Sequence, residues 1–353
     1  MEKPKPVPGS SNAGVADTRP ASAVRRRAVR DTLVRLLSVL ALVAASPLAA
    51  MQLFSVDGEA PDVIGELSLT TTVYADTLSD LARAYDQGYN EMRLANPAVD
   101  PWLPGEGTEV VVPNLYVIPD APRRGIVVNV PEMRMYYFLQ DRRAGTQRVM
   151  TFPISIGRQN WVTPKGQTRI VAKVKDPAWY PPKSIREEHA AEGDELPRIV
   201  PAGPDNPLGE HALRLSIDGY LIHGTNKPYG IGMRVTHGCI RMYPKDVATV
   251  FGLANVGTPV HIVNQPYKVG IAHGRIYLEV HPHLEEDQHL FADQYSQVIK
   301  LILARVKDHD AQLVWSEVKR ALDARSGIPQ PVGTYRPKAS VRSDTPAVPP
   351  VAG

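Results

Sequence analysis

Residues 221–242, LIHGTNKPYGIGMRVTHGCIRM, are the most informative part of this 353-residue chain. It contains two His-Gly pairs, at His223 and His237, and the second pair runs directly into Cys239, the single cysteine. A thiol nucleophile needs a nearby imidazole to form a thiolate near neutral pH, and backbone N–H groups to hold the oxyanion that develops on an attacked carbonyl. Although buried packing is the ordinary role of a free cysteine, these neighbours predict a nucleophile with a histidine base.

The flanking residues place both reactive side chains on defined elements. Residues 219–223 are an apolar run that predicts a strand ending at His223. Cys239 follows a glycine, which leaves its backbone accessible. A helix is expected to begin around Pro244, where its N-terminus favours a thiolate.

The surrounding sequence predicts a mainly β domain. Short apolar runs separated by Gly/Pro turns are typical of a β-sandwich or barrel, and they occur at 126–130, 135–138, 149–156, 169–174, 213–222 and 260–263. Residues 176–210 are long, irregular and Pro-rich, and such segments are usually functional or disordered. Because this segment contains Trp179, we expect an ordered flap beside the site.

Residues 67–118 predict a small separate module. Residues 67–74 are rich in β-branched and aromatic residues and predict a strand. Thr77 precedes a helical pattern, a second short helix is expected at 90–95, and residues 108–112 predict another strand. The expected order is strand, helix, helix, strand.

The two ends of the chain differ from the middle in composition. Residues 1–50 carry a basic region, an apolar run at 36–45 and small residues after it, which is the order of a secretory signal peptide. An uncleaved anchor and a misplaced start site remain alternatives. Residues 51–66 are expected to be a linker, 266–328 a helical extension with two amphipathic helices, and 329–353 a disordered Pro-rich tail. The net charge of +3 reflects the leader, and no basic stripe with interleaved aromatics indicates nucleic acid binding.

Residues 123–265 resemble the YkuD-type L,D-transpeptidase catalytic domain, in which a His-Gly pair precedes a Ser/Thr-His-Gly-Cys run. Here these are His223-Gly224 and Thr236-His237-Gly238-Cys239. Residues 67–118 resemble a LysM-like module, although Ala75 stands where that pattern usually has glycine. The resemblance implies a mainly β fold, with a YkuD-type β-sandwich or barrel preceded by a βααβ module and followed by C-terminal helices. It also implies the periplasmic, Gram-negative branch of the family.

The resemblance implies a role for each matching residue. Cys239 is the nucleophile and His223 is the base, with its ring oriented by the carbonyl of Gly224. His237 supports the site or has a structural role, and the N–H groups of Gly238 and Cys239 hold the oxyanion. The residues expected to contact substrate, each with packing, turn formation or ion pairing as its ordinary alternative, are Arg241, Thr225, Asn226, Tyr229 and Trp179.

The implied reaction is acyl transfer on peptidoglycan stem peptides. Cys239 attacks the bond between diaminopimelate and the terminal D-Ala of a tetrapeptide, D-Ala leaves, and an amine resolves the thioester. The acceptor is left open between another stem (a 3-3 cross-link), an outer-membrane lipoprotein, glycine and water. A carboxypeptidase or other hydrolase on the same scaffold and a non-catalytic protein that binds peptidoglycan glycan strands are the competing functions.

A metal or organic cofactor is not expected. His281 and His283 lie close to Glu285, Glu286 and Asp287, but acidic residues suit the first turn of a helix. Cys239, His237 and His223 are zinc-ligand types, yet their spacing is unfavourable and a fourth ligand is missing. The sequence therefore predicts an enzyme that works through its own side chains and is peripheral to the envelope.

Overall fold

The computed structural model describes residues 53–56, 62–141 and 145–337 of the chain. These residues belong to a compact unit that spans Ala49–Gly353. The expected signal peptide, and the tail beyond residue 337, lie outside the described residues. Within the described part of the chain, no helix has the length and apolar character needed to cross a bilayer.

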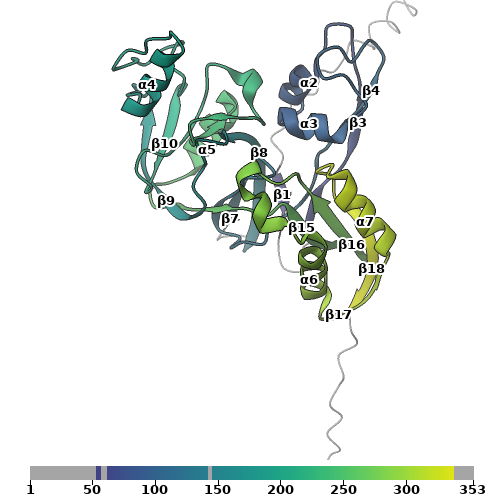
Figure 1. Ribbon diagram of the computed structural model, residues 1–353. Coiled ribbons are helices and arrows are strands. Elements are labelled where there is room, and N and C mark those ends of the chain that lie inside the picture. Colours follow the sequence, from purple (N-terminus) through teal and green to yellow (C-terminus); the bar gives the residue numbers. More distant parts are fainter. Residues whose placement is uncertain (1–52, 57–61, 142–144, 338–353) are drawn as a thin grey trace, which may run out of the picture. The chain divides into compact units, whose positions relative to one another are not determined.

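The largest sheet of the described residues is closed, and its strands lie on the left in Figure 1. Its strands follow the order β8-β13-β11-β10-β9-β14-β6-β7, and β7 pairs again with β8, so the sheet closes on itself. The prediction of a mainly β, barrel-like catalytic domain is confirmed. The bounds are β6 Gly125–Asn129, β7 Arg134–Asp141, β8 Thr146–Gly157, β9 Gly166–Lys175, β10 His211–Leu215, β11 Leu221–His223, β13 Ile240–Met242 and β14 Pro259–Val263.

The interior of this sheet is apolar, and it fixes which way the neighbouring side chains face. Leu213, Ile222 and Ile240 are almost fully buried in one cluster, to which Val247 and Val250 of helix α5 (Pro244–Leu253) also belong. Burying one such aliphatic side chain stabilises a fold by roughly 1.5–3 kcal/mol. Because side chains alternate along a strand, the burial of Ile222 and Ile240 directs the residues on either side of them to the opposite face.

The βααβ order expected for the N-terminal module is present. Strands β3 (Ser68–Thr71) and β4 (Glu109–Val112) pair antiparallel, and helices α2 (Leu78–Ala84) and α3 (Tyr89–Ala95) lie between them in the chain. Helix α2 begins where the sequence indicates, because Thr77 and Asp80 form a reciprocal capping box. The module has its own core of Leu78, Leu81, Ala82, Met92, Val110 and Val112.

The linker expected at 51–66 is wrong in its described part. Strand β1 (Leu53–Ser55) pairs with β8 of the barrel, and β2 (Val63–Gly65) pairs with β5 (Leu115–Val117). A second short strand, β12 (Arg234–Thr236), also joins β8. Each of these strands has three residues, and its partner lies far along the chain, so local sequence patterns do not reveal the pairing.

The C-terminal region is an α/β layer, which corrects the expectation of helices alone followed by a disordered tail. Helices α6 (Gln294–Val306) and α7 (Trp315–Ala324) pack against a sheet of order β15-β16-β18-β17 (Figure 1). Its strands are β15 Tyr267–Ala272, β16 Arg275–Val280, β17 His309–Leu313 and β18 Gln330–Pro337. Part of the segment expected to be disordered, 330–337, is therefore an inner strand of this sheet.

Candidate active site

Strands β11 and β13 bring His223 and Cys239 to neighbouring positions. The strands are parallel, with Ile222 opposite Ile240 and His223 opposite Arg241. Cys239 immediately precedes β13, so it lies beside the start of β11, and neighbouring strands are about 4.8 Å apart. Because Ile222 and Ile240 face the core, His223, Cys239 and Arg241 share the opposite face of the sheet.

The thiol of Cys239 is a weak acid in this setting. Its side chain is half-buried, and Sγ donates to the carbonyl of Gly219 at 3.7 Å. Burial raises the pKa of the Cys239 thiol, while the N–H of Leu221 and the charge of Arg241 partly offset this effect. At neutral pH the resting cysteine is therefore a thiol and requires a base to remove its proton.

The His223 ring is buried, oriented by a backbone hydrogen bond and neutral at neutral pH. His223 is 4% exposed, and its Nδ1 donates to the carbonyl of Gly224 at 2.7 Å, the contact that the family resemblance implies. This bond places the proton on Nδ1 and leaves Nε2 as the basic atom. Burial and the charge of Arg241 lower the pKa of His223 to about 4, against the opposing effect of the Gly224 and Leu208 carbonyls. The imidazole is thus neutral and ready to accept a proton at neutral pH.

Arg241 lies on the same face of the sheet as His223 and Cys239. It is opposite His223 on one side and opposite Ser155 of β8 on the other. Its Nε is buried and has no hydrogen-bond partner among the described residues. A guanidinium with an open donor near a thiol suits a carboxylate, which arginine binds in a bidentate manner.

His237 is tied to the flap. Arg158 Nη2 donates to His237 Nε2 at 2.6 Å, and Glu188 Oε2 lies 3.2 Å from the same nitrogen. Trp161 packs its ring edge-on at 5.0 Å. Burial and Arg158 lower the pKa of His237. Since Glu188 belongs to helix α4 (Lys183–Ala191), His237 connects the nucleophile turn to segment 176–210, which contains a helix that the sequence did not predict.

The turn before Cys239 requires glycine and is held by hydroxyls. Gly238 has φ +99°, and a Cβ there would lie 2.8 Å from the Tyr220 ring. Thr236 Oγ1 donates to the carbonyl of Cys239 at 2.6 Å and accepts from the Gly238 N–H at 3.2 Å. The Gly238 N–H, one of the two expected oxyanion donors, is therefore engaged in the turn, which leaves the Cys239 N–H as the remaining candidate.

The other four residues expected to contact substrate differ in exposure and in their neighbours. Thr225 is buried, and its Oγ1 accepts from the Lys227 N–H at 2.9 Å, so it shapes the turn after His223. Asn226 is exposed in that turn. Tyr229 is 55% exposed and lies near Arg83 of the βααβ module. Trp179 pairs through its backbone with Val200 inside segment 176–210. Arg158, Trp161 and Glu188 are the site neighbours that sequence reasoning missed.

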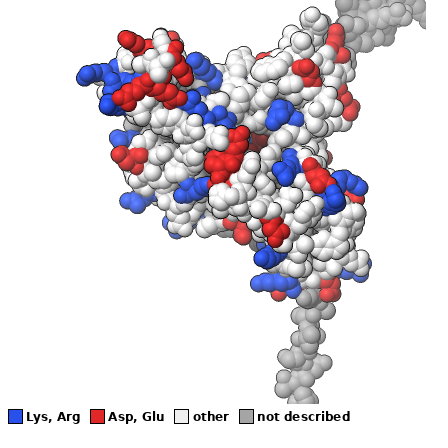
Figure 2. Space-filling model, in the orientation of Figure 1, with Lys and Arg blue, Asp and Glu red and all other residues white. Residues whose placement is uncertain are grey.

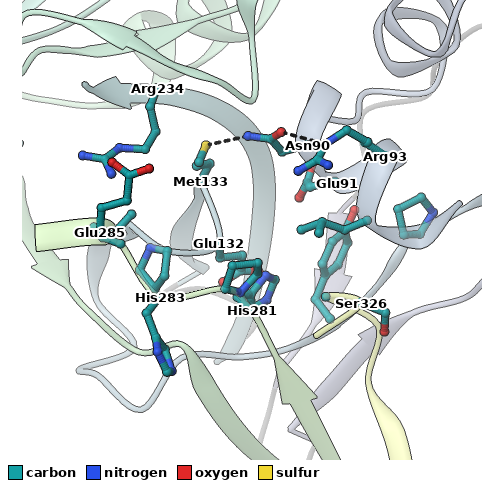
Figure 3. A pocket seen from close by; sticks show the side chains of 17 residues that line it. Asn90, Glu91, Arg93, Glu132, Met133, Arg234, His281, His283, Glu285 and Ser326 are labelled. Atoms are coloured by element: carbon teal, nitrogen blue, oxygen red, sulfur yellow. Dashed lines mark hydrogen bonds between the residues drawn. The ribbon is translucent and has the colours of Figure 1, made fainter. Parts of the chain in front are cut away.

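A separate cavity of about 250 Å³ lies away from the nucleophile. It is lined by both acidic and basic side chains, including Glu91, Arg93, Arg234 and Glu285, and neither Cys239 nor His223 contributes to it (Figure 3). Several of its charged groups already have partners, since Arg234 binds Glu286 at 2.8 Å and Glu91 binds Arg134 at 2.6 Å. We therefore assign the chemistry to the β11–β13 face.

Of the histidine and acidic residues considered in the sequence as metal ligands, His281 belongs to a different buried cluster, which is built around a lysine. Glu132, Glu279 and His281 are buried within ligand distance of one another. The ammonium of Lys268 lies 2.8 Å from both carboxylates. Although burial alone would raise the pKa of Glu132, the charges of Lys268 and His281 hold it below its ordinary value. The lysine already neutralises these acids, so we assign the cluster a structural role.

Lys/Arg and Asp/Glu side chains are interspersed on the face shown in Figure 2. A continuous basic stripe, as nucleic acid binding would require, is not seen on that face.

Comparison with known proteins gives a consistent result. Residues 123–262 match the family model described as the L,D-transpeptidase catalytic domain, YkuD. The chain is 40% identical over 268 residues to "Probable L,D-transpeptidase YcfS" of Escherichia coli, covering 74% of this chain and 81% of that protein. It is 37% identical over 306 residues to "Probable L,D-transpeptidase ErfK/SrfK" of the same species, covering 84% and 96%. The catalytic domain of the E. faecium L,D-transpeptidase is 21% identical, with a TM-score of 0.31 over 41% of this chain and 100% of that one.

Proposed function

Because this chain belongs to the L,D-transpeptidase family, we propose that Cys239 carries the acyl group of a peptidoglycan stem peptide as a thioester. The observation that supports this most is the shared face of β11 and β13, which carries a half-buried thiol, a neutral imidazole and a guanidinium whose Nε has no hydrogen-bond partner among the described residues. The substrate class is peptidoglycan. The donor is proposed to be a tetrapeptide stem whose terminal D-Ala is released.

The first half-reaction follows from the protonation states of Cys239, a thiol, and His223, a neutral imidazole. Nε2 of His223 takes the proton of the Cys239 thiol as Sγ forms a bond to the carbonyl carbon of diaminopimelate. The oxyanion is held by the Cys239 N–H. When the C–N bond breaks, His223 returns the proton to the leaving amine of D-Ala, and a thioester remains.

The second half-reaction uses the same groups in reverse. An acceptor amine attacks the thioester carbonyl while His223 removes its proton, and the new amide forms as the C–S bond breaks. The thiolate of Cys239 then takes the proton back. Another stem peptide or the lysine side chain of a lipoprotein provides such an amine, whereas water would give a carboxypeptidase product.

The product distribution tests this proposal. Purified protein is incubated with a disaccharide-tetrapeptide, with and without a lipoprotein acceptor, and the products are separated and weighed by mass spectrometry. A cross-linked dimer or a lipoprotein conjugate, with one D-Ala released for each, supports transfer and identifies the acceptor. Tripeptide alone would assign the protein to the hydrolases. An absence of turnover would leave the wall-binding alternative.

Arg241 is proposed to hold a stem carboxylate. Replacing it by glutamine is expected to raise KM for the tetrapeptide by about 10- to 100-fold, because a hydrogen-bonded charge pair contributes roughly 1.5–3 kcal/mol. The matched control is Arg214→Gln, since Arg214 is exposed on β10, which is separated from the strand of Arg241 by β11. Steady-state kinetics of both variants checks this, and equal KM values for the two variants would contradict the assignment.

The βααβ module is proposed to bind glycan strands in the manner of a LysM module. The loops at either end of its helices are joined, since the Leu78 N–H donates to Pro101 and the Gly107 N–H donates to Thr72. These joined loops carry exposed apolar side chains, among them Tyr74 at 86% and Trp102 at 59% exposed. Exposed patches of this kind usually mark a binding surface.

Trp102→Ala is expected to weaken co-sedimentation with insoluble peptidoglycan by about 10-fold, because stacked aromatic faces supply on the order of 1 kcal/mol or more each. Trp315→Ala, at a tryptophan that is 50% exposed on α7, is the matched control. If both variants sediment like the wild type, the module does not bind the wall through this surface. The periplasm is the compartment we propose, since the substrate lies there and residues 1–50 have the order of a signal peptide.

A further inference from the structure

We infer that the βααβ module is a positioning element of the active site, which it supports through a turn at residues 86–90 that holds the segment 229–232. This inference rests on the proposed function, because its readout is the transfer reaction. The 229–232 segment lies between His223 and Cys239 in the chain, so it forms part of the loop that joins the base to the nucleophile.

Two backbone hydrogen bonds join the module to this segment. The Tyr89 N–H donates to the carbonyl of Ile231 at 2.9 Å, and the Asn90 N–H donates to the carbonyl of Gly232 at 3.3 Å. Both donors belong to the first turn of α3, where backbone N–H groups have no partner within the helix. The 229–232 segment thus supplies acceptors that the N-terminus of α3 needs.

Helix α2 contacts the same segment from its own side. Ser79 Oγ donates to the carbonyl of Tyr229 at 3.3 Å, and the guanidinium of Arg83 lies 5.5 Å from the Tyr229 ring centre. Both helices of the module therefore converge on one stretch of four residues.

Two glycines allow the close approach. Gly232 has φ +85°, and a Cβ on it would lie 2.4 Å from Gly88 Cα and from Tyr89 N. A Cβ on Gly88 would lie 2.8 Å from Gly232 Cα. Any side chain at Gly232 would therefore have to displace backbone from backbone.

The 229–232 segment also contacts Ser155 and approaches Arg241. Ser155 Oγ donates to the carbonyl of Gly230 at 2.7 Å, and Ser155 is opposite Arg241 in the sheet. A Cβ on Gly230 would lie 3.9 Å from Arg241 Nη1. A shift of this segment would therefore move the surroundings of the guanidinium proposed to hold the substrate.

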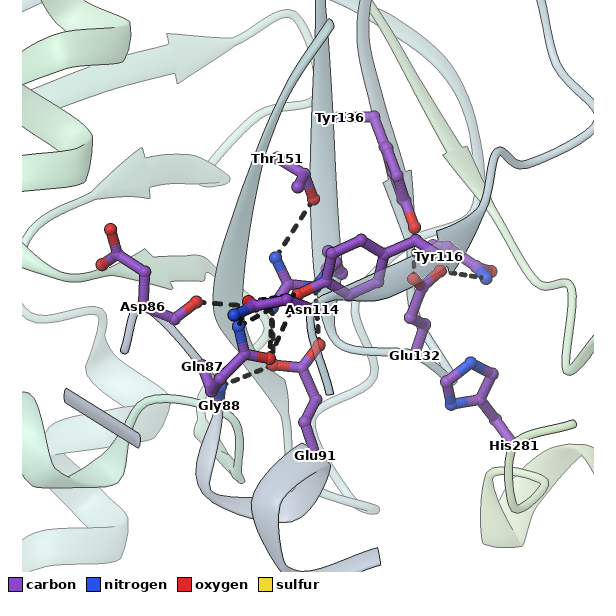
Figure 4. Close-up of polar contacts among 12 residues, drawn as sticks. Asp86, Gln87, Gly88, Glu91, Asn114, Tyr116, Glu132, Tyr136, Thr151 and His281 are labelled. Carbon is purple, nitrogen blue, oxygen red and sulfur yellow. Dashed lines mark hydrogen bonds and ion pairs between the residues drawn. The ribbon is translucent and has the colours of Figure 1, made fainter. Parts of the chain in front are cut away.

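A buried arginine fixes the module's turn to the barrel. Arg134 of β7 is 1% exposed, and its guanidinium binds both carboxylate oxygens of Glu91, at 2.6 and 2.8 Å. Glu91 Oε2 also accepts from the Gly88 N–H at 2.5 Å, and Gln87 Oε1 accepts from Arg134 at 3.3 Å (Figure 4). The Tyr116 ring lies 4.2 Å from the same guanidinium. A bidentate, buried pair of this kind fixes direction as well as distance.

The strand that follows the nucleophile reaches the same turn. Tyr243, the residue after β13, donates its hydroxyl proton to the carbonyl of Gln87 at 3.1 Å. The 86–90 turn is thus bonded to the barrel through Arg134, to the strand after Cys239 through Tyr243, and to the loop before Cys239 through Gly232.

A pair of glycine variants tests this inference. In Gly232→Ala the added methyl meets the backbone of Gly88, whereas in Gly257→Ala, at a similar φ of +92°, it meets nothing within 4 Å. The two substitutions carry similar backbone strain, so their difference isolates the contact. We expect Gly232→Ala to lower kcat/KM for transfer by about 100-fold, since small misplacements in a site have effects of this size. Gly257→Ala is expected to remain within about two-fold of wild type.

A second readout separates positioning from general loss of structure. Alkylation of Cys239 by iodoacetamide in Gly232→Ala is expected to keep its wild-type rate, because the hydrogen bonds described for the thiol and its turn join Gly219 and Thr236 rather than the module. Equal kcat/KM values for the two glycine variants would overturn the inference, as would a parallel loss of alkylation and transfer.

A double variant, Ser79→Ala/Arg83→Ala, replaces Gly232→Ala if circular dichroism shows that Gly232→Ala does not fold. Its control is Arg93→Ala on α3. In that case, a kcat/KM of the double variant equal to that of Arg93→Ala would overturn the inference. An inactive wild type would instead count against the proposed function.

Discussion

Cys239→Ala is expected to lose transfer activity almost completely, by about 10⁴-fold or more, because the thiol removed is the group proposed to form the covalent bond to the substrate carbonyl. Release of D-Ala from a tetrapeptide is the quantity to measure. Since Cys239 is the single cysteine, treating the wild type with iodoacetamide should reproduce the loss, and the same treatment should leave the variant unchanged.

The loss in Cys239→Ala should not come from unfolding. The side chain is half-buried, and its hydrogen bond to Gly219 is long at 3.7 Å, so the free energy of unfolding is expected to change by less than about 1 kcal/mol. Thermal denaturation of both proteins checks this. D-Ala release by Cys239→Ala at a rate within about ten-fold of wild type would exclude Cys239 as the nucleophile.

His223→Gln is expected to lower kcat/KM by roughly 10²- to 10⁴-fold at neutral pH, the usual contribution of a positioned general base. The two proteins should also differ in their dependence on pH. In the wild type, the pKa of His223 near 4 means that the basic, neutral ring is present above that pH and is lost below it. Activity should therefore rise with pH through about 4 and then remain level to neutrality.

In His223→Gln the acidic limb should disappear, and activity should follow the thiolate of Cys239. Because burial raises the pKa of that thiol, the rate of the variant should increase about ten-fold per pH unit up to alkaline pH. His261→Gln, at a half-buried histidine on β14, is the control and should keep the wild-type profile. An acidic limb that persists in His223→Gln would assign it to another group.

The proposed catalytic pair could be predicted from sequence because its signals are local. The apolar run that ends at His223 predicted a strand, and β11 ends at that residue, whereas the short strand β13 after Cys239 was not predicted. Helix α2 was predictable for the same reason, since Thr77 and Asp80 cap it over three residues of chain.

The function of His237 was not predictable from its place in the chain. Its position next to Gly238 and Cys239 suggested chemistry, but its Nε2 accepts from Arg158 and lies 3.2 Å from Oε2 of Glu188, and these partners are 79 and 49 residues away in sequence. Only the fold brings them together. His237 is therefore better explained as the link between the nucleophile turn and the flap helix α4.

The C-terminal sheet and the contact between the module and the 229–232 segment could not be predicted from the sequence either. Strand β18 includes Pro331 and Pro337, and its composition indicated disorder, yet it pairs with β16 on one side and β17 on the other. Gly88 and Gly232 give no signal in sequence that they meet. Non-local pairings and backbone contacts of this kind depend on tertiary structure, which local propensity does not encode.

The proposed thioester is tested most directly by the intact mass of the protein after brief mixing with a disaccharide-tetrapeptide. The wild type is expected to gain the mass of the disaccharide-tripeptide acyl group and to release one D-Ala per adduct, and peptide mapping is expected to place the adduct on Cys239. D-Ala release without any covalent intermediate, or an adduct mapped to another residue, would contradict the proposal.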